Sequence, residues 1–365
     1  MKTKSTKKII LSLSSAAVLV LIAIAAIWDE NGGGGDLSSP PVQISIAEAF
    51  TVPAADAQTQ AIVTAAKSFL ALLDESQRQT VIFPFEDNAQ RAKWSNFPHP
   101  YVTRRGIRRG DMSQEQLSAL DNLLQQVMSG DGFRNIEYQL EADNASGNYD
   151  KQSNFSEANY FVSFLGAPSL NQPWMLQFGG HHLAINATVF GPDISFSPML
   201  TGGEPLNITF KGEKIFITEA EVLAAQALLE SLSDDQKTLA VRSNRKTRLL
   251  LGPGQHGVTP APEGISGADL TPEQRSLFLK LISERLGFIN QDDFFSKMKI
   301  VQAELEQTWF GWWGPQDQPG TAYYRITGPS LIIEYSPEGS SNSNDHAHNM
   351  YRDPSNDYGS SWISK

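Results

Sequence analysis

The pattern of hydrophobic and polar positions separates an apolar N-terminal segment from a long body of mixed helical and extended stretches. Residues 9–28 are uncharged and predominantly apolar, and Lys2, Lys4, Lys7 and Lys8 precede them. A helix of this length spans roughly 30 Å, about one hydrocarbon core, and basic residues before it favour a cytoplasmic N-terminus. The pattern therefore predicts a membrane-directed signal and an exported body.

The signal and the linker that follows it have predictable boundaries. We predict a signal peptide or signal anchor over residues 1–30 and a flexible Gly/Ser/Pro-rich linker over residues 31–44. Residues 23–25 (Ala-Ile-Ala) would serve as a cleavage site, whereas the long apolar run favours an anchor. The body is thus expected to be membrane-anchored through residues 9–28, or secreted or periplasmic after cleavage.

Two stretches of the body, about 155 residues apart, have similar patterns. A hydroxyl residue followed three positions later by Gln, the pattern of a capping box, occurs at Ser113 and again at Thr271. An apolar pattern of period 3.6 follows each of them. Two hairpin patterns with glycine in the turn align when Gly180 is set on Gly328. These matches indicate an internal repeat.

The order of the elements predicts the fold class. In each repeat the helical patterns come first and the strand patterns follow, which is typical of an α+β fold. We therefore predict an internally duplicated α+β body, with residues 45–210 and 211–365 as its halves. Each half should consist of helices followed by antiparallel strands, and the two should pack as one pseudo-symmetric body.

Composition narrows the functional classes. The chain contains no cysteine, so it forms neither a disulfide nor a lipid-modified cysteine after the signal. Its formal net charge is −11 and its N-terminal segment is basic, so the body is still more acidic and nucleic acid is not an expected partner. A phosphate-binding glycine loop is also absent from the sequence, and no nucleotide cofactor is expected.

Four of the six histidines fall in two close clusters. On an extended segment, the spacing of His346 and His348 puts both imidazoles on one face, where they can converge on one ion. His181 and His182 are adjacent, so on a regular strand they would point to opposite faces, and only one could serve a given site. A solvated C-terminal loop and a hydrogen-bonded core histidine are the structural alternatives for these clusters.

Taken together, the clusters predict a metal site in which His346 and His348 meet His181 or His182. Three nitrogens and one oxygen would suit Zn, Cu or Fe. An open coordination position would permit metal-dependent hydrolysis or redox chemistry, and a closed one would be structural. The candidate metal ligands are His181, His182, His346, His348 and Asp357. The candidate catalytic or supporting residues are Glu334, Asp353, Arg325 and Tyr324.

Other polar motifs are interpreted more simply. His99 and His256 are predicted to be loop residues, and the basic stretch 104–109 is predicted to be a solvated loop held by nearby acids. An aromatic group near the C-terminus could instead present flat rings to a glycan or another planar ligand, or could be a strand core. Its members are Trp309, Phe310, Trp312, Trp313, Tyr323, Tyr324 and Tyr335.

Several motifs together resemble the domain-of-unknown-function family numbered 3500. They are the stretches 179–186 (Gly-Gly-His-His-Leu-Ala-Ile-Asn), 202–205 (Gly-Gly-Glu-Pro), 323–329 (Tyr-Tyr-Arg-Ile-Thr-Gly-Pro), 334–335 (Glu-Tyr), 346–348 (His-Ala-His) and 352–359 (Arg-Asp-Pro-Ser-Asn-Asp-Tyr-Gly). The resemblance covers roughly residues 61–359. It implies that these motifs belong to one pattern found in exported bacterial proteins, and it leaves the reaction open.

The leading hypothesis is an exported protein with a histidine-rich metal site, acting as a metal-dependent hydrolase or oxidoreductase on a small molecule or glycan. One alternative is a module that binds a glycan or cell-envelope polymer through its aromatic face. The other is a structural protein without metal.

Overall fold

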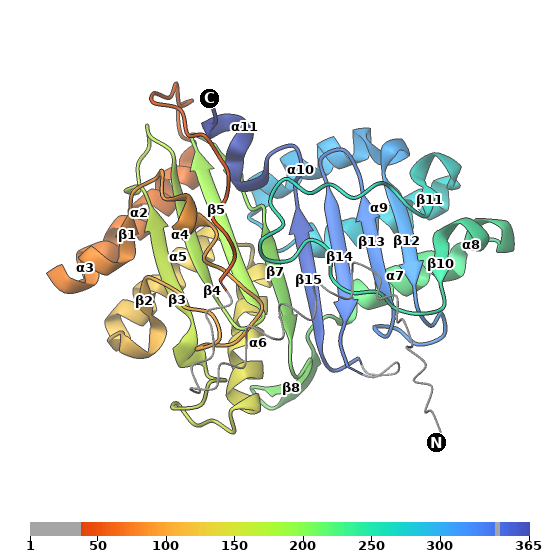
Figure 1. The fold of residues 1–365 in the computed structure, drawn as a ribbon, viewed down its shortest axis with the longest axis horizontal. Helices are drawn as coiled ribbons and strands as arrows, with labels where there is room; N and C mark the ends of the chain where they lie inside the picture. The colour runs from red at the N-terminus through yellow and green to blue at the C-terminus, as the bar shows by residue number, and fades with distance from the viewer. Residues whose placement is uncertain (1–37, 340–343) are drawn as a thin grey trace, which may run out of the picture. The chain divides into compact units, whose positions relative to one another are not determined.

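The computed structural model describes residues 38–339 and 344–365, and its centre is one large mixed sheet. Figure 1 shows this sheet running across the body. The strands are β1 (Ile82–Phe83), β2 (Ile107–Arg108), β3 (Phe161–Leu165), β4 (Trp174–Gly180), β5 (Leu183–Phe190), β6 (Asp193–Ser195), β7 (Met199–Gly203), β10 (Val241–Ser243), β11 (Ile265–Ser266), β12 (Trp309–Trp313), β13 (Tyr323–Thr327), β14 (Ile332–Pro337) and β15 (Ala347–Arg352). β8 (Asn207–Phe210) and β9 (Glu213–Phe216) form a separate hairpin.

Strand order places β15, the last strand of the chain, beside β7 at the middle of the sheet. The order is β1-β3-β4-β5-β7-β15-β14-β13-β12-β10, and β7 pairs with β15 antiparallel, with Thr201 opposite Asn349. On one side, β3 lies between antiparallel β4 and parallel β1; on the other, β12 lies between antiparallel β13 and parallel β10. The prediction of antiparallel strands is therefore wrong for the two outer pairs, because helices connect those strands.

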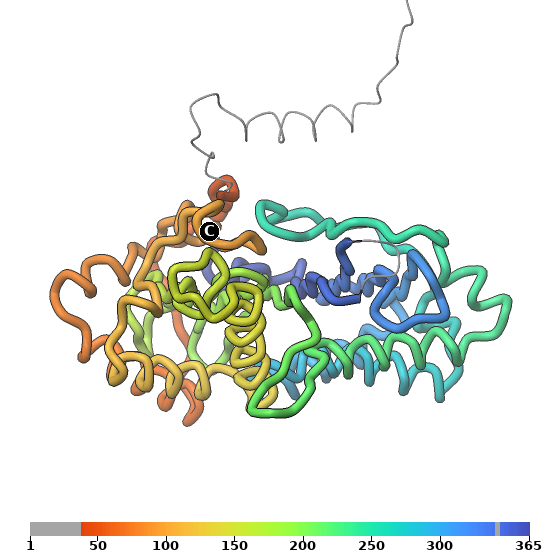
Figure 2. Tube along the Cα trace, turned by 90° about the horizontal axis from the view of Figure 1, so that it is seen from below, coloured from red at the N-terminus to blue at the C-terminus, as the bar shows by residue number. Residues whose placement is uncertain are grey.

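Most of the helices cover one face of the sheet, and long connecting segments, one of which contains the short helix over residues 88–91, cover the other. Figure 2 shows the helical layer on one side and the segments 84–106 and 243–264 on the opposite side. Ten α-helices lie in the described residues. They are α2 (Ala57–Ala71), α3 (Glu75–Val81), α4 (Asn88–Arg91), α5 (Gln114–Val127), α6 (Gly130–Ser146), α7 (Glu219–Ser231), α8 (Asp234–Ala240), α9 (Pro272–Leu286), α10 (Gln291–Ala303) and α11 (Ser360–Ile363).

The predicted capping boxes begin α5 and α9. The Gln116 amide N–H donates to Ser113 Oγ (3.2 Å), and the Ser113 N–H donates back to Gln116 Oε1 (2.9 Å). Thr271 and Gln274 exchange the same two bonds at α9. These bonds satisfy two N–H groups that a helix start leaves without intrahelical partners, so the sequence signal is confirmed at both sites.

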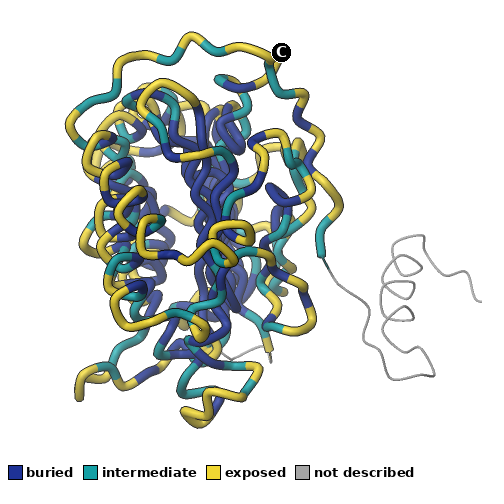
Figure 3. Tube along the Cα trace, turned by 90° about the vertical axis from the view of Figure 1, so that its left-hand side faces the viewer, coloured by how far each residue is buried: buried dark blue, intermediate teal, exposed yellow. Residues whose placement is uncertain are grey.

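One main hydrophobic core joins both parts of the body. Its buried members include Phe69 and Phe164 from the first part of the chain and Phe278 and Phe310 from the second. Figure 3 shows the buried strands between the more exposed outer layers. The sheet therefore packs as one mixed α+β body, in agreement with the predicted class.

The packed body begins inside the predicted linker. Val42 and Ile44 are buried, and the Val42 N–H donates to the Asn88 carbonyl (3.1 Å). Residues 38–365 form one compact unit. No helix in residues 38–339 or 344–365 is long and apolar enough to cross a membrane. The apolar run 9–28 lies outside the described residues.

Candidate metal centre

The turn between β4 and β5 presents two histidines together. Gly180 pairs with Leu183, so His181 and His182 form a two-residue hairpin turn. His182 has φ 54°, in the left-handed region. The ring centroids of His181 and His182 are 3.8 Å apart. The prediction that the two rings point to opposite faces is wrong, because these residues are in the turn and strand alternation does not apply to them.

The start of β15 brings His346 and His348 to the same place. His348 pairs with Gly202 of β7, while His346 directly precedes the strand. Gly202 is required for this approach, since a Cβ there would lie 2.1 Å from the Ala347 carbonyl oxygen. The two imidazole centroids are 5.1 Å apart. The central β7–β15 pairing therefore positions both histidines beside the β4–β5 turn.

Three imidazoles converge at this point. The Nε2 atoms of His182 and His346 are 3.0 Å apart, and the ring centroids of His182 and His348 are 4.8 Å apart. One ring nitrogen from each of the three lies within 4.8 Å of the others, so the group could hold a metal ion. Two ligand nitrogens about 3 Å apart are compatible with metal–nitrogen bonds of about 2.0–2.1 Å.

Carboxylates lie near the Nδ1 atoms of two of these rings. Glu204 Oε1 is 3.5 Å from His346 Nδ1, and Glu338 Oε1 is 3.6 Å from His348 Nδ1. A carboxylate at Nδ1 favours a proton there and leaves Nε2 as the ligand atom. With the proton on Nδ1, His348 Nε2 accepts a hydrogen bond from the Asn96 amide (3.2 Å), and an ion bound at this nitrogen would replace that bond.

A second group shares His182 with the first. His181 Nδ1 lies 2.7 Å from Asp143 Oδ1, on α6. Asp143, His181 and His182 each offer a ligand atom within 4.8 Å of the others, so this group could also hold a metal ion. All three side chains are buried.

Burial sets the charge states of these groups. It lowers the pKa of His182 well below the usual imidazole value and lowers that of His346 as well, so both favour the neutral form that binds metals. Burial raises the pKa of Asp143. The neighbouring His348 lowers the pKa of Glu338 through a side-chain hydrogen bond, which keeps that carboxylate ionised.

Exposure differs between the groups. The His346 side chain is 25% exposed and Glu204 is 48% exposed, whereas His182 is only 2% exposed as a residue. The three-histidine group therefore reaches the surface through His346.

Buried polar groups fix the turn that carries His182. One guanidinium nitrogen of Arg104 donates to the carbonyls of Ser95, Phe97 and Gly180. The Tyr160 hydroxyl donates to the His181 carbonyl (2.9 Å). Arg104 is thus buried and structural, unlike the predicted solvated residue. The later arginines of stretch 104–109 are held by acids as predicted, Arg109 by Asp121 among them.

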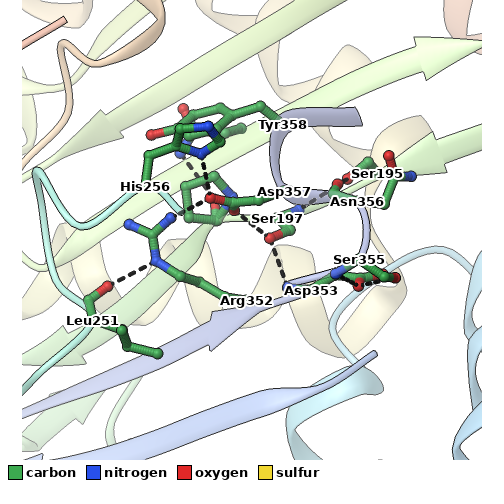
Figure 4. Close-up of polar contacts among 12 residues, drawn as sticks. Ser195, Ser197, Leu251, His256, Arg352, Asp353, Ser355, Asn356, Asp357 and Tyr358 are labelled. Atoms are coloured by element: carbon green, nitrogen blue, oxygen red, sulfur yellow. Dashed lines mark hydrogen bonds and ion pairs between the residues drawn. The ribbon is translucent and has the colours of Figure 1, made fainter. Parts of the chain in front are cut away.

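The structure places Asp357 and Asp353 away from the three-histidine group. Asp357 accepts hydrogen bonds from Arg352 (2.6 Å) and Ser197 (2.6 Å) and lies 2.9 Å from His256 Nδ1. Figure 4 shows these contacts. Asp353 pairs with Lys297 (2.6 Å). Contacts with Arg352, Ser197 and His256 engage Asp357, and the contact with Lys297 of α10 engages Asp353, instead of a metal site.

The remaining candidates also have other partners. Glu334 is buried and accepts from Leu250 N–H, Leu251 N–H and the Tyr323 hydroxyl. Arg325 pairs with Glu263 (2.5 Å). Tyr324 stacks between Tyr335 and Trp312 inside the core. The predicted aromatic face is therefore largely buried: Phe310, Trp312, Tyr323, Tyr324 and Tyr335 are core residues.

Sequence reasoning missed four residues that border the two histidine groups. Asp143 lies on a helix far from both histidine motifs, and Asn96 lies in a loop without a ligand pattern. Two of the four could have been suspected from the sequence. Glu204 stands in the Gly-Gly-Glu-Pro motif, and Glu338 begins the polar loop that precedes His346.

The fold and the histidine groups define a mixed α+β protein with a candidate metal centre near the middle of the sheet, where β15 pairs with β7 beside the β4–β5 turn. The chain belongs to the family described as protein of unknown function (DUF3500), whose model matches residues 55–360. This confirms the family predicted from the motifs. No curated protein and no solved structure significantly matches the chain.

Proposed function

We propose that this protein is an exported metalloenzyme whose centre is formed by His182, His346 and His348. The observation that supports the proposal is the convergence of three imidazoles from segments more than 160 residues apart in sequence, with two Nε2 atoms 3.0 Å apart. A chance surface cluster would not be expected to bury two of its three members.

The donor set fits a divalent transition metal. Three neutral imidazoles suit Zn²⁺, Cu²⁺ or Fe²⁺ better than Ca²⁺ or Mg²⁺, which prefer oxygen ligands. Glu204 and Glu338 stand where they would hold the Nδ1 protons of His346 and His348.

When bound, such an ion supplies Lewis acidity at a position that His346 connects to the surface. The half-exposed carboxylate of Glu204 lies 3.5 Å from His346 Nδ1 and would accept a proton from water or substrate there. We therefore favour hydrolysis of a small molecule or glycan, and we keep metal-dependent oxidation as the second function if the native metal is copper or iron.

Two further parts of the proposal are export and internal duplication. The apolar run 9–28 and the lysines before it support export, with the body beyond the membrane. Recurrence of contacts supports an internal duplication: Gln116 Nε2 donates to Gln77 Oε1 (2.8 Å), and Gln274 Nε2 donates to Gln236 Oε1 (2.8 Å).

The first test is metal content. The full-length chain, purified in detergent without a polyhistidine tag, should contain about one or more transition-metal ions, and their identity should separate hydrolysis from oxidation. The double variant His346→Ala/His348→Ala should lose that metal. Replacement by Ala of His256, which pairs with Asp357 and belongs to neither candidate group, is the matched control. Metal-free wild-type protein that takes up none on reconstitution would overturn the proposal.

A further inference from the structure

His182 belongs to both histidine groups. Its Nε2 faces His346 Nε2 at 3.0 Å. Its ring also lies against that of His181, at a centroid distance of 3.8 Å. His182 is therefore the single side chain through which the two groups are joined.

Two buried polar atoms in the second group have no hydrogen-bond partner among the described residues. They are Nδ1 of His182 and Oδ2 of Asp143. A buried polar atom without a partner costs about 1–3 kcal/mol, so such atoms usually have a ligand to satisfy them. Both belong to residues whose ligand atoms lie within 4.8 Å of one another.

The second group has the right chemistry for a metal ion of its own. It combines two imidazoles with a carboxylate, a set typical of zinc, iron and copper sites. His181, His182 and Asp143 are 4%, 2% and 2% exposed, so an ion there would be enclosed by protein, whereas the three-histidine group reaches solvent.

An imidazole can bind one ion through each ring nitrogen once its ring proton has been released to solvent. Metal–nitrogen bonds of about 2.0 Å on either side of the ring would put the ions about 6 Å apart. The His182 ring centroid lies 3.8 Å from that of His181, 4.9 Å from that of His346 and 4.8 Å from that of His348. Its Nε2 is near His346, and its Nδ1 has no hydrogen-bond partner among the described residues. The same ring can therefore serve both sites.

We propose that Asp143, His181 and His182 form a second metal site, bridged through the His182 imidazolate to the ion held by His182, His346 and His348. This inference rests on the proposed function, because it adds a buried ion beside the surface-connected one. The buried ion holds His182 in place and takes up the charge of Asp143.

The test uses Cu²⁺ as the probe, added to metal-free full-length chain. Wild-type protein should bind two Cu²⁺ per chain. An imidazolate bridge couples the two unpaired electrons antiferromagnetically, so the integrated electron paramagnetic resonance signal should fall well below the total bound copper.

The variant Asp143→Asn should bind one Cu²⁺ and show the full signal for that ion. Asparagine keeps an oxygen that accepts from His181 but is a poor metal ligand. His181→Gln is the second variant, with the same expected outcome. Glu137→Gln, on the same helix but paired with Lys211, is the matched control and should retain two coupled ions. Circular dichroism checks the fold of each variant.

The outcomes separate this inference from the proposed function. One Cu²⁺ in wild type that disappears in His346→Ala/His348→Ala would overturn the second site and leave the proposed function standing. Two ions with a full uncoupled signal, or two ions retained in both Asp143→Asn and His181→Gln, would also overturn the inference. No bound Cu²⁺ at all would contradict the proposed function itself.

Discussion

Two hairpin turns of the central sheet have matching strand register and different chemistry. In the β4–β5 turn, His182 meets two other imidazoles and carries a buried Nδ1 without a partner among the described residues. In the β13–β14 turn, Ser330 donates to Glu304 (2.6 Å), and Lys297 donates to the Ser330 carbonyl (2.6 Å) and to Asp353 (2.6 Å). The Lys297 ammonium group binds the polar groups at the β13–β14 turn. The β4–β5 turn instead brings together imidazoles that could bind a metal ion.

This difference shows that matching strand register does not determine the role of a turn. Both hairpins connect strands of matching register, since Gly179 opposes Ala184 and Thr327 opposes Ile332. The turns differ in backbone conformation, because His182 has φ 54° whereas Ser330 is not among the residues with positive φ, and they differ in the side chains that surround them. Function therefore depends on the side chains at the site and not on the hairpin alone.

The largest expected effect is on metal affinity, when His182 of the β4–β5 turn is replaced and the turn backbone is kept. His182→Asn should lower metal affinity by more than about 100-fold, because losing a direct ligand costs more than losing a supporting group. Asparagine tolerates the left-handed conformation at this position. Ser330→Asn in the other turn is the control. Competition with a chelator measures both, and equal affinities would contradict the comparison.

The second turn should respond in stability instead. Lys297→Met leaves Asp353 and the Ser330 carbonyl without their buried cation and should destabilise the protein by about 3 kcal/mol. Denaturant unfolding measures the loss, with Lys299→Met, an exposed residue of the same helix, as control. Metal content should not change. A metal loss in Lys297→Met with normal folding would show that the turns are not independent.

Glu221 and Thr59 are the third residues of α7 and α2. We expect Glu221 to make the free energy of unfolding depend on pH, whereas Thr59 does not titrate. Burial raises the pKa of Glu221 to about 7, and Asn349 donates to it (2.5 Å). The folded state thus holds a proton that the unfolded state releases at lower pH, and stability falls as pH rises. The loss from this group should be about 2 kcal/mol between pH 5 and pH 7.

Glu221→Gln should remove that part of the pH dependence, because glutamine stays neutral across the range. Unfolding curves for the variant and wild type at pH 5, 6 and 7 measure it. The free energies of the two proteins should diverge toward pH 7, with the variant the more stable. Parallel curves would show that Glu221 does not titrate in this range.

The smallest effect tests the equivalence of the two helical regions. Ser113→Ala and Thr271→Ala each remove the N-cap of a capping box and should each cost about 1 kcal/mol. Thermal unfolding of the single variants measures the two losses. A large difference between them would show that α5 and α9 contribute unequally to the fold.

Much of the fold follows from local patterns. The capping boxes at Ser113 and Thr271 and the apolar helices after them form as predicted, because these signals depend on residues three or four positions apart. The parallel pairing of β1 with β3 and of β10 with β12 was not predictable in the same way. It depends on how helices carry the chain back to the sheet.

Only part of the site was visible in the sequence. Histidine is rare in this chain, so its two clusters stood out and indicated metal chemistry. The supporting acids were misassigned, because Asp357 and Asp353 are close to His348 in sequence but belong to other networks. Asp143 is distant in sequence and could not be recognised from spacing.

The sequence by itself determined the family, the helices with their caps, and the residue type that dominates the candidate centre. The tertiary structure alone decided which histidines meet and which carboxylates lie beside them. The physical reason is the pairing of β7 with β15 and the two-residue β4–β5 turn, which bring His182, His346 and His348 together. Such contacts depend on which strands, distant in sequence, pair with each other, and local sequence patterns do not specify that order.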